Sequence, residues 1–175
     1  MQIRDALETD LQGITDIYNH AVAHTTAIWN EREVDLENRR TWFNDRAAAG
    51  YPILVAFNGT DVLGYASFGD WRAFDGFRHT VEHSIYVRAD QHGQGIGRAL
   101  MEALITRARL IGKHVMVAGI EAGNAGSIHL HEKLGFKQVA HMPQVGTKFG
   151  RWLDLAFLQL TLDTRDDPDG IGQRQ

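Results

Sequence analysis

Apolar residues recur along this chain with two different spacings, and the spacing changes several times. Four segments have an apolar residue at every third or fourth position, which predicts helices behind Thr9, behind Asp35, at 97–111 and at 125–134. Shorter runs rich in β-branched and aromatic residues predict strands at 2–6, 52–57, 62–68, 81–87, 114–120, 136–142 and 152–162. The order of these elements predicts an α/β fold, with one mixed sheet and helices on both faces.

Polar residues and glycines mark the expected ends of these elements. Thr9 followed by Gln12 fits a capping box at the start of the first helix, and Asp35 fits the N-cap of the second. Residues 58–61 (Asn-Gly-Thr-Asp) predict a hairpin turn, which makes the first half of the sheet antiparallel. The helix at 97–111 predicts a parallel crossover in the middle of the sheet.

Length and composition indicate one ordinary domain. The chain has 175 residues, of which 43% are apolar, and we expect a single domain over residues 1–163. Residues 143–151 are expected to be a loop that joins the last two strands. The polar residues 164–175 are expected to form a flexible C-terminal tail.

The composition also excludes several classes of protein. The absence of cysteine rules out a disulfide scaffold, a thiolate metal site and a cysteine nucleophile. The net charge of −4, from 18 basic and 22 acidic residues, gives no electrostatic reason to expect nucleic-acid binding. No apolar run approaches the ~20 residues that span a bilayer, and the first residues lack the apolar core of a signal peptide. We therefore expect a cytoplasmic protein without a metal, a nucleic-acid partner or a membrane segment.

A glycine-rich segment at residues 90–98, Asp-Gln-His-Gly-Gln-Gly-Ile-Gly-Arg, lies between a predicted strand and a predicted helix. Gly93, Gly95 and Gly97 alternate with larger residues, so backbone amides can approach a ligand closely. The N-terminus of the following helix adds unpaired N–H groups and the positive end of its dipole, which favour a phosphate. A glycine-rich turn that merely starts a helix is the alternative.

Two common phosphate-binding motifs do not fit this segment. A Rossmann fingerprint counted from Gly93 requires glycine at position 98, which is Arg98. A P-loop ends in Gly-Lys followed by Ser or Thr, and the segment has no such ending. The segment instead resembles the acetyl-CoA loop of the GNAT superfamily of N-acetyltransferases, Gln/Arg-x-x-Gly-x-Gly/Ala. His92 stands where that family usually has Gln or Arg.

Longer segments extend this resemblance over about residues 2–162. The run Asn124-x-x-Ser127-x-x-x-His131-x-x-x-Gly135-Phe136 matches a second GNAT motif. Residues 71–78, 80–84 and 142–154 are similar to the subgroup that acetylates phosphinothricin, methionine sulfoximine and methionine sulfone, which typically has histidine at position 131. The resemblance implies a GNAT fold with a mixed, mostly antiparallel sheet, and acetyl-CoA as the co-substrate.

The resemblance also implies how acetyl-CoA binds. Its pyrophosphate is expected on the loop at 93–98, and its pantetheine arm is expected to pair like an added strand with residues 85–87. The Val87 amide is then the expected donor to the developing oxyanion. The cofactor-binding residues implied in this way are Ile85, Tyr86, Val87, Gly93, Gln94, Gly95, Ile96, Gly97, Arg98, Asn124 and Ser127.

Acetyl transfer from a thioester to an amine needs a neutral amine, a donor for the oxyanion and a proton for the leaving thiolate. Glu82 is the candidate general base, chiefly because the subgroup has Glu at this place; an exposed carboxylate or a partner for Arg78 is the alternative. His131 lies one helical turn after Ser127 and is the candidate for protonating the thiolate or positioning the acyl group, with a structural role as the alternative. His83 faces the other side of the strand and is expected to pack or to support the site.

Two predicted loops combine basic and aromatic residues, as a site for a small anionic or zwitterionic amine would. Guanidinium groups bind a carboxylate or phosphinate, and aromatic rings exclude water. The substrate-binding residues expected there are Arg72, Phe74, Asp75, Gly76, Phe77, Arg78, Lys148, Phe149 and Arg151, with Trp29 and Glu31 as a lid. In the alternative interpretation the basic groups pair with Asp70, Asp75 and Asp154, and the aromatic residues belong to the core.

These observations favour an N-acetyltransferase that acts on the α-amine of a small methionine- or glutamate-like analogue. Peptide or protein N-acetylation is one alternative, which bulky loops at 71–78 and 143–152 would obstruct. A non-catalytic acyl-CoA-binding sensor is another, and it predicts the loss of Glu82. The resemblance also implies a homodimer in which the loop at 143–152 helps to close the site, with Lys148, Phe149 and Arg151 at or beside the interface.

Overall fold

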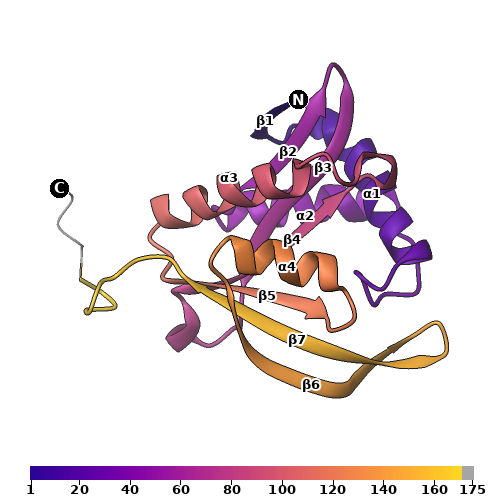
Figure 1. Cartoon of the computed structure of the whole chain (residues 1–175). Helices are drawn as coiled ribbons and strands as arrows, with labels where there is room; N and C mark the ends of the chain where they lie inside the picture. The colour runs from indigo at the N-terminus through magenta and orange to yellow at the C-terminus, as the bar shows by residue number, and fades with distance from the viewer. Residues whose placement is uncertain (171–175) are drawn as a thin grey trace.

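A seven-stranded sheet forms the centre of the fold (Figure 1). The computed structural model describes residues 1–170. The strands are β1 (Gln2–Asp5), β2 (Ile53–Asn58), β3 (Asp61–Asp70), β4 (Thr80–Val87), β5 (Val115–Glu121), β6 (Lys137–Lys148) and β7 (Arg151–Thr161), in the spatial order β1-β2-β3-β4-β5-β7-β6. Every neighbouring pair is antiparallel except β4 and β5. The predicted mixed, mostly antiparallel sheet is confirmed.

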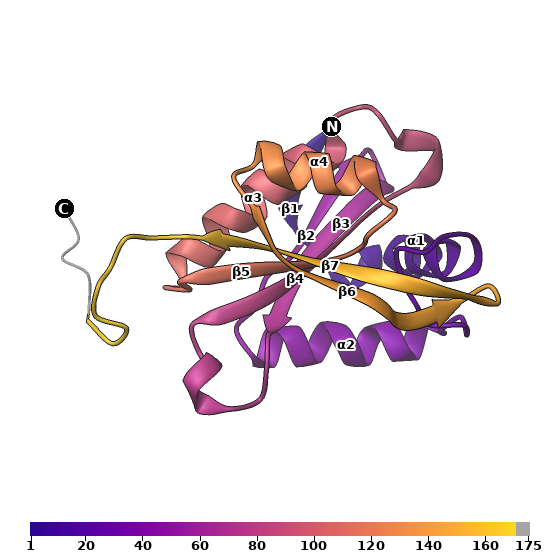
Figure 2. The same ribbon diagram turned by 60° about the horizontal axis from the view of Figure 1, so that its bottom comes forward.

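Helices cover both faces of this sheet. The helices α1 (Leu11–His24) and α2 (Leu36–Ala48) pack on one face, and α3 (Ile96–Leu110) and α4 (Ala125–Lys133) pack on the other (Figure 2). Three short 3-10 turns lie in the connections: η1 (Glu8–Asp10), η2 (Asp75–Phe77) and η3 (Ala89–Gln91). Within residues 1–170, no helix combines the length and the apolar character that crossing a bilayer requires.

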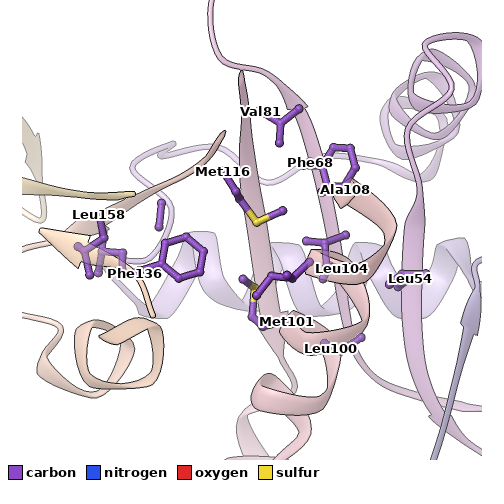
Figure 3. Close-up of a cluster of buried hydrophobic side chains, with 14 of the residues drawn as sticks. Leu54, Phe68, Val81, Leu100, Met101, Leu104, Ala108, Met116, Phe136 and Leu158 are labelled. Atoms are coloured by element: carbon purple, nitrogen blue, oxygen red, sulfur yellow. The ribbon is translucent and has the colours of Figure 1, made fainter. Parts of the chain in front are cut away.

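The larger hydrophobic core lies between α3 and the sheet (Figure 3). Leu100, Leu104 and Ala108 follow each other at one-turn spacing on α3 and are fully buried. They pack in one cluster with Phe68 of β3 and Met116 of β5. This packing fixes the axis of α3, and therefore the glycine-rich segment at its N-terminus, against the middle strands.

The strands β4 and β5 pair over only part of their lengths. Their parallel register runs from Thr80 opposite Val115 to Glu82 opposite Val117, and it ends there. β5 stays paired with β7 as far as Glu121, so β4 and β5 diverge beyond Glu82. Within the described sheet, the backbone groups of β4 that face β5 after this point have no strand partner.

The start of α1 differs from the predicted capping box at Thr9. The N-cap is Asp10, whose carboxylate accepts two bonds from the Arg4 guanidinium, at 2.6 and 3.0 Å, and one from a backbone amide at 2.7 Å. An ionised carboxylate binds these donors more strongly than a hydroxyl would, so Asp10 is the residue turned inward. The predicted N-cap of α2 is confirmed, because Asp35 Oδ1 accepts the Asn38 amide at 2.8 Å.

The last two strands form a long hairpin, whose outer part, residues 142–154, is called the arm below. The expectation of a loop at 143–151 is wrong, because β6 continues to Lys148 and β7 begins at Arg151. Only Phe149 and Gly150 connect the strands, and both have positive φ, 51° and 72°. Pro143 is tolerated because β6 is an edge strand, where a missing N–H need not break the sheet. The arm projects beyond the other strands (Figure 1).

The segment that follows β7 is tied to the rest of the protein. Arg78 donates to both carboxylate oxygens of Asp169, at 2.6 and 2.8 Å. Arg165 donates to the Gly112 carbonyl at 2.9 Å. Residues 164–170 thus contact the rest of the domain, the expectation of a flexible tail stays a prediction, and 171–175 lie outside the described residues.

A buried lysine joins the arm to the C-terminal end of α1. The Lys148 side chain is 2% exposed, and its Nζ donates to the carbonyls of Val22 and Thr25 at 2.6 Å, and also to that of Ile28. Carbonyls at the end of a helix attract a cation, and an ammonium offers three N–H groups. All three are used here. This arrangement leaves no donor for a ligand and does not favour the predicted role of Lys148 in binding substrate, which stays a prediction.

We expect Lys148→Met to lower the free energy of unfolding by about 2–3 kcal/mol. Methionine keeps the length of the side chain but leaves buried carbonyls without a donor, at about 1–3 kcal/mol for an unsatisfied group. Urea unfolding measures the loss. Lys137→Met, at an exposed position of the same strand, is the control and should change stability by less than about 0.5 kcal/mol. Equal losses in the two variants would contradict the anchoring role.

Candidate active site

Two hollows meet where β4 and β5 diverge. The larger, called the cleft below, has a volume of about 1120 Å³ and is lined by α1, by the end of β4, by the following loop and by the first turns of α3 and α4. The smaller, called the small cavity, has a volume of about 270 Å³ and is lined by Ala27, Trp29, Trp71, Arg72, Glu82, Gly119, Glu121, Leu155 and Phe157. Ala27 lines both, so the two hollows are adjacent.

The loop before α3 has the geometry of an anion site. Gly93 and Gly95 have φ of 78° and 79°, which side chains other than glycine rarely adopt. Gly95 is the N-cap of α3 and supplies no side-chain hydrogen bond to the first turn. The N–H groups of that turn therefore remain available to a ligand, at the positive end of the helix dipole.

His92, the residue that departs from the family pattern, closes this loop onto β4. Its Nε2 lies 3.0 Å from the Val87 carbonyl, and because a carbonyl can only accept, Nε2 carries the proton. His92 also lines the cleft. The substitution thus supplies a contact within the loop and leaves the backbone cradle unchanged.

The wall of the cleft formed by β4 can accept an extended, amide-rich ligand. Ile85, Tyr86 and Val87 pair with β3 on one side, and their other side faces the divergence from β5. Such an unpaired edge can bind a ligand as an added strand. Asn124 caps α4 through Oδ1, which accepts the Ser127 amide at 3.1 Å, so its Nδ2 is the group left to face a ligand.

Nearly all the residues implied for cofactor binding come together around the cleft. Those lining it are Ile85, Tyr86, Val87, Gly93, Gly95, Ile96, Gly97, Arg98, Asn124 and Ser127. Gln94 is the member of the predicted set that does not line it. The side chains of Tyr86 and Ile85 point to opposite faces of β4. The backbone groups of this stretch are therefore what a ligand along the edge of β4 can contact in every residue.

Glu82 is the last β4 residue paired with β5, and its side chain reaches the small cavity. Burial raises the pKa of its carboxyl, and the positive charge of Arg72 partly opposes this shift. Gly119 of β5 makes room for the carboxylate, since a Cβ at that position would lie 2.9 Å from Glu82 Oε1. Glu82 is therefore a desolvated carboxylate with raised proton affinity, held in a narrow space.

Arg72 is the member of the predicted substrate-binding set that lines the small cavity. Its guanidinium lies over the Trp71 ring, 4.6 Å from the centroid, and Trp71 in turn packs edge-on against Phe157. Trp29 of the predicted lid also lines the cavity, whereas Glu31 does not. An aromatic-walled cavity thus contains a cation and a carboxylate on neighbouring segments.

The other predicted substrate residues lie elsewhere in the chain. Arg78 is bound to Asp169, and Lys148 is buried against carbonyls, so neither points a free donor into the small cavity. Phe74 is 78% exposed, and Phe149 lies at the exposed tip of the arm. The remaining members, Asp75, Gly76, Phe77 and Arg151, are on the surface and outside the small cavity. The two predicted loops therefore do not converge on one site within a single chain.

Several cavity residues escaped the sequence analysis. Gly119 interrupts a β-branched run, and a glycine inside a strand often marks the close approach of another group. That signal was available for Gly119. Glu121 accepts hydrogen bonds from the nearby Gly123 amide at 2.9 Å and from Thr26 Oγ1 at 3.2 Å, and only the folded chain brings Thr26 to Glu121.

His131 lies beneath the cleft and not on its surface. It is 1% exposed, its Nδ1 donates to the Ser127 carbonyl at 2.7 Å, and its Nε2 lies 2.9 Å from His83 Nε2. In the neutral state His131 Nε2 must accept, so His83 Nε2 donates, and His83 Nδ1 has no partner within residues 1–170.

Both imidazoles are held in the neutral form. Burial lowers the pKa of His83 to about 3, with the neighbouring His131 adding to the shift. Burial also lowers the pKa of His131, against the hydrogen bond to Ser127. The ring of His131 lines neither hollow, and both its nitrogens are engaged, so this geometry does not favour a proton donor to the thiolate, and the role of His131 stays a prediction. The expected packing role of His83 agrees with this pair.

Comparison with known proteins decides the family. A family model described as "Acetyltransferase (GNAT) family" matches residues 14–136, more than half of the chain, and this stretch contains the glycine-rich loop and Glu82. The chain belongs to the GNAT acetyltransferases. The order of strands and helices around the diverging pair agrees with this membership.

Relatives of high identity have more specific names. L-methionine sulfoximine/L-methionine sulfone acetyltransferase of Pseudomonas aeruginosa is 65% identical over 168 residues, which is 95% of this chain and 98% of the relative. L-amino acid N-acyltransferase MnaT of Escherichia coli is 62% identical over 172 residues, 98% and 100% of the two chains. The solved structure of yncA, an acetyltransferase of Salmonella typhimurium with its cofactor acetyl-CoA, is 60% identical, has a TM-score of 0.94, and matches over 96% of this chain and 97% of that one.

The predictions of a GNAT fold, of acetyltransferase activity and of acetyl-CoA as co-substrate are confirmed. The cleft fits this co-substrate, because glycines at positive φ open the loop to a pyrophosphate and the free edge of β4 can pair with an amide-rich arm. Within residues 1–170 there is no group of three or more His, Asp or Glu side chains that could hold a metal.

We expect Gly95→Val to abolish acetyl-CoA binding in a protein that remains folded. Valine is strained at φ of 79°, so the loop must change its path and turn its amides away from the pyrophosphate. Calorimetric titration with acetyl-CoA measures the loss. Gly50→Val is the matched control, because Gly50 also has a positive φ of 71° but lies at the end of α2, away from the cleft. Unchanged affinity in Gly95→Val would refute the assignment.

Proposed function

We propose that this acetyltransferase transfers the acetyl group of acetyl-CoA to the α-amine of a small amino-acid analogue, of the methionine sulfoximine, methionine sulfone or phosphinothricin type. The observation that carries the proposal is the small cavity beside the cleft, which contains both Glu82 and Arg72. An α-amino acid offers an ammonium to the carboxylate and a carboxylate to the guanidinium. Two of the relatives reported above are named for amino acids or their analogues.

The size of the small cavity favours a small acceptor. Its volume of about 270 Å³ lies just below the usual range of about 300–1,000 Å³ for small-molecule sites, and the rings of Trp29, Trp71 and Phe157 line it. A peptide would need an open groove through Trp29, Trp71 and Phe157. The alternative of a non-catalytic acyl-CoA sensor predicts the loss of Glu82, and the chain retains this residue at the wall of the small cavity.

The proposed chemistry is direct attack without a covalent enzyme intermediate. Glu82 takes a proton from the ammonium of the acceptor, directly or through a water, and the neutral amine attacks the thioester carbon. The Val87 amide stabilises the oxyanion as the C–N bond forms. The C–S bond then breaks. The nitrogen that has attacked still carries one proton more than the product amide, and this proton passes to the leaving thiolate. N-acetylation removes the charge of the α-amine, and we propose detoxification of such analogues as the physiological role.

We expect Glu82→Gln to lower kcat at pH 7 by about 100-fold, the scale of general base assistance. As the pH is lowered, Glu82 becomes protonated and the wild-type rate should fall. Because burial raises the pKa of Glu82, this fall should begin at a pH above the ordinary carboxyl range. The deficit of the variant should shrink at high pH, where free amine becomes abundant. Glu37→Gln, on the exposed side of α2, is the control. Parallel pH–rate profiles for Glu82→Gln and the wild type would contradict the base role.

We expect Arg72→Met to raise KM for methionine sulfone by about 10- to 100-fold, because a charge-assisted hydrogen bond to the carboxylate contributes about 1.5–3 kcal/mol. The decarboxylated amine of the same side chain should be a poor acceptor for the wild type, with no further loss in Arg72→Met. Steady-state kinetics with both acceptors tests this. Arg40→Met is the control, because it removes a guanidinium that pairs with Glu8 away from the small cavity, and it should leave the KM of both acceptors unchanged. Equal losses on acid and amine would show that Arg72 supports structure only.

We also propose that the enzyme works as a cytoplasmic homodimer. Trp152 and Phe149 of the arm are 67% and 57% exposed, and an isologous contact would bury them. We therefore expect light scattering to give twice the mass of one chain, and Trp152→Glu to shift the protein toward the monomer. A fully active wild-type monomer at working concentration would contradict the proposal.

A further inference from the structure

Trp29 forms one wall of the small cavity, and its position is set from outside that cavity. Its Nε1 donates to the Thr26 carbonyl at 2.9 Å. Its six-membered ring packs on Gly146 of the arm: a Cβ at Gly146 would lie 2.1 Å from Cζ3 and 2.2 Å from Cε3 of the indole. Side chains do not approach so closely, so the ring can occupy this place only because residue 146 has no Cβ.

Gly146 and Lys148 are two residues apart on β6 and therefore face the same way. Lys148 binds the carbonyls of Thr25 and Ile28, and Gly146 receives the ring of Trp29. The arm thus holds both the main chain and the side chain of the segment that closes the small cavity. The register shift in β6 between Met142 and Gly146 is the feature that brings this glycine opposite Leu153.

The backbone at Gly146 does not itself require glycine, because its φ is not positive. The obstacle to alanine at position 146 is a steric clash of its Cβ with the indole of Trp29. Ordinary contacts of a Cβ begin near 3.4 Å, so the ring would have to withdraw by more than an ångström. The arm blocks one direction, the Nε1 hydrogen bond restrains the other end of the indole, and the small cavity, which the ring lines, offers space into which the ring can swing.

We propose that Gly146 is a specificity-determining residue, which sets the length of acceptor side chain that the small cavity accepts by fixing the position of Trp29. This inference rests on the proposed function in one respect, because it takes the small cavity as the acceptor site. Gly146 itself does not line that cavity. A longer side chain fits while residue 146 is glycine, and a shorter one is favoured when a Cβ pushes the indole inward.

The test compares methionine sulfone with S-methylcysteine sulfone, the analogue that is one methylene shorter. Gly146→Ala should lower kcat/KM for the longer acceptor relative to the shorter one by about 10- to 100-fold, the range that one methylene commands in a tight pocket. The KM for acetyl-CoA should not change, because the cleft is not touched. Thr147→Ala is the control, at the next residue of the same strand with its side chain exposed on the opposite face, and it should keep the wild-type ratio.

A double-mutant cycle with Trp29→Phe separates this role from a general loss of stability. Phenylalanine lacks the ring atoms that meet Gly146, so Gly146→Ala should change the acceptor ratio by no more than about twofold in the Trp29→Phe background. Trp29→Phe alone should shift the preference toward the longer acceptor. This single variant also serves as the test if Gly146→Ala does not fold, and an unshifted preference would then overturn the inference.

A crystal structure of Gly146→Ala gives a readout that does not depend on turnover. The indole is expected to lie displaced into the small cavity. If the wild type acetylates no amino-acid analogue of the proposed types, the proposed function fails, and the position of the indole still shows whether Gly146 sets the position of Trp29. An indole in its original place, or an unchanged acceptor ratio in an active variant, would overturn it.

Discussion

Parallel pairing between β4 and β5 stops at Glu82 and Val117, and the active site depends on this interruption. If the pairing continued, β5 would satisfy the backbone groups of residues 85–87 and fill the space into which both hollows open. Because it stops, the same strand offers a free edge to acetyl-CoA and carries Glu82 into the small cavity at the point of divergence. A single interruption of a ladder thus places the co-substrate next to the group that activates the acceptor.

Features encoded within a few consecutive residues could be predicted from the sequence. The glycine-rich loop, the helix behind it and the strand before it are contiguous in the chain, so their order predicts an anion site, and the family resemblance adds the residues expected to bind acetyl-CoA. The wall that α1 contributes to the cleft could not be predicted, because only the folded chain brings that helix beside the loop. The basic loops could not be assigned in this way, because composition shows which side chains are charged and not what they bind. Arg78 meets Asp169, 91 residues later, and Lys148 meets carbonyls more than 100 residues earlier.

Helical and strand periodicity also limited what could be said of the histidines. One-turn spacing correctly relates His131 to Ser127, but the ring turns back to the Ser127 carbonyl and meets His83, which reaches it from a separate strand. Two neutral rings in the core then form a support under the floor of the cleft. Gly119 and Gly146 show the converse: an absent side chain leaves space, and only the fold shows that a carboxylate occupies one such space and an indole the other.

The three hydrogen bonds of Lys148 have a consequence for how sequences of such proteins are compared. They converge on one nitrogen from three carbonyls, and the tetrahedral ammonium suits that arrangement. A guanidinium is flat and spreads its donors over three nitrogens, so it cannot make the same set of bonds in the same space. An exchange of lysine for arginine, which substitution tables score as conservative, would therefore remove an anchor at this position. Charge alone is a poor guide to which basic residues of this fold tolerate replacement.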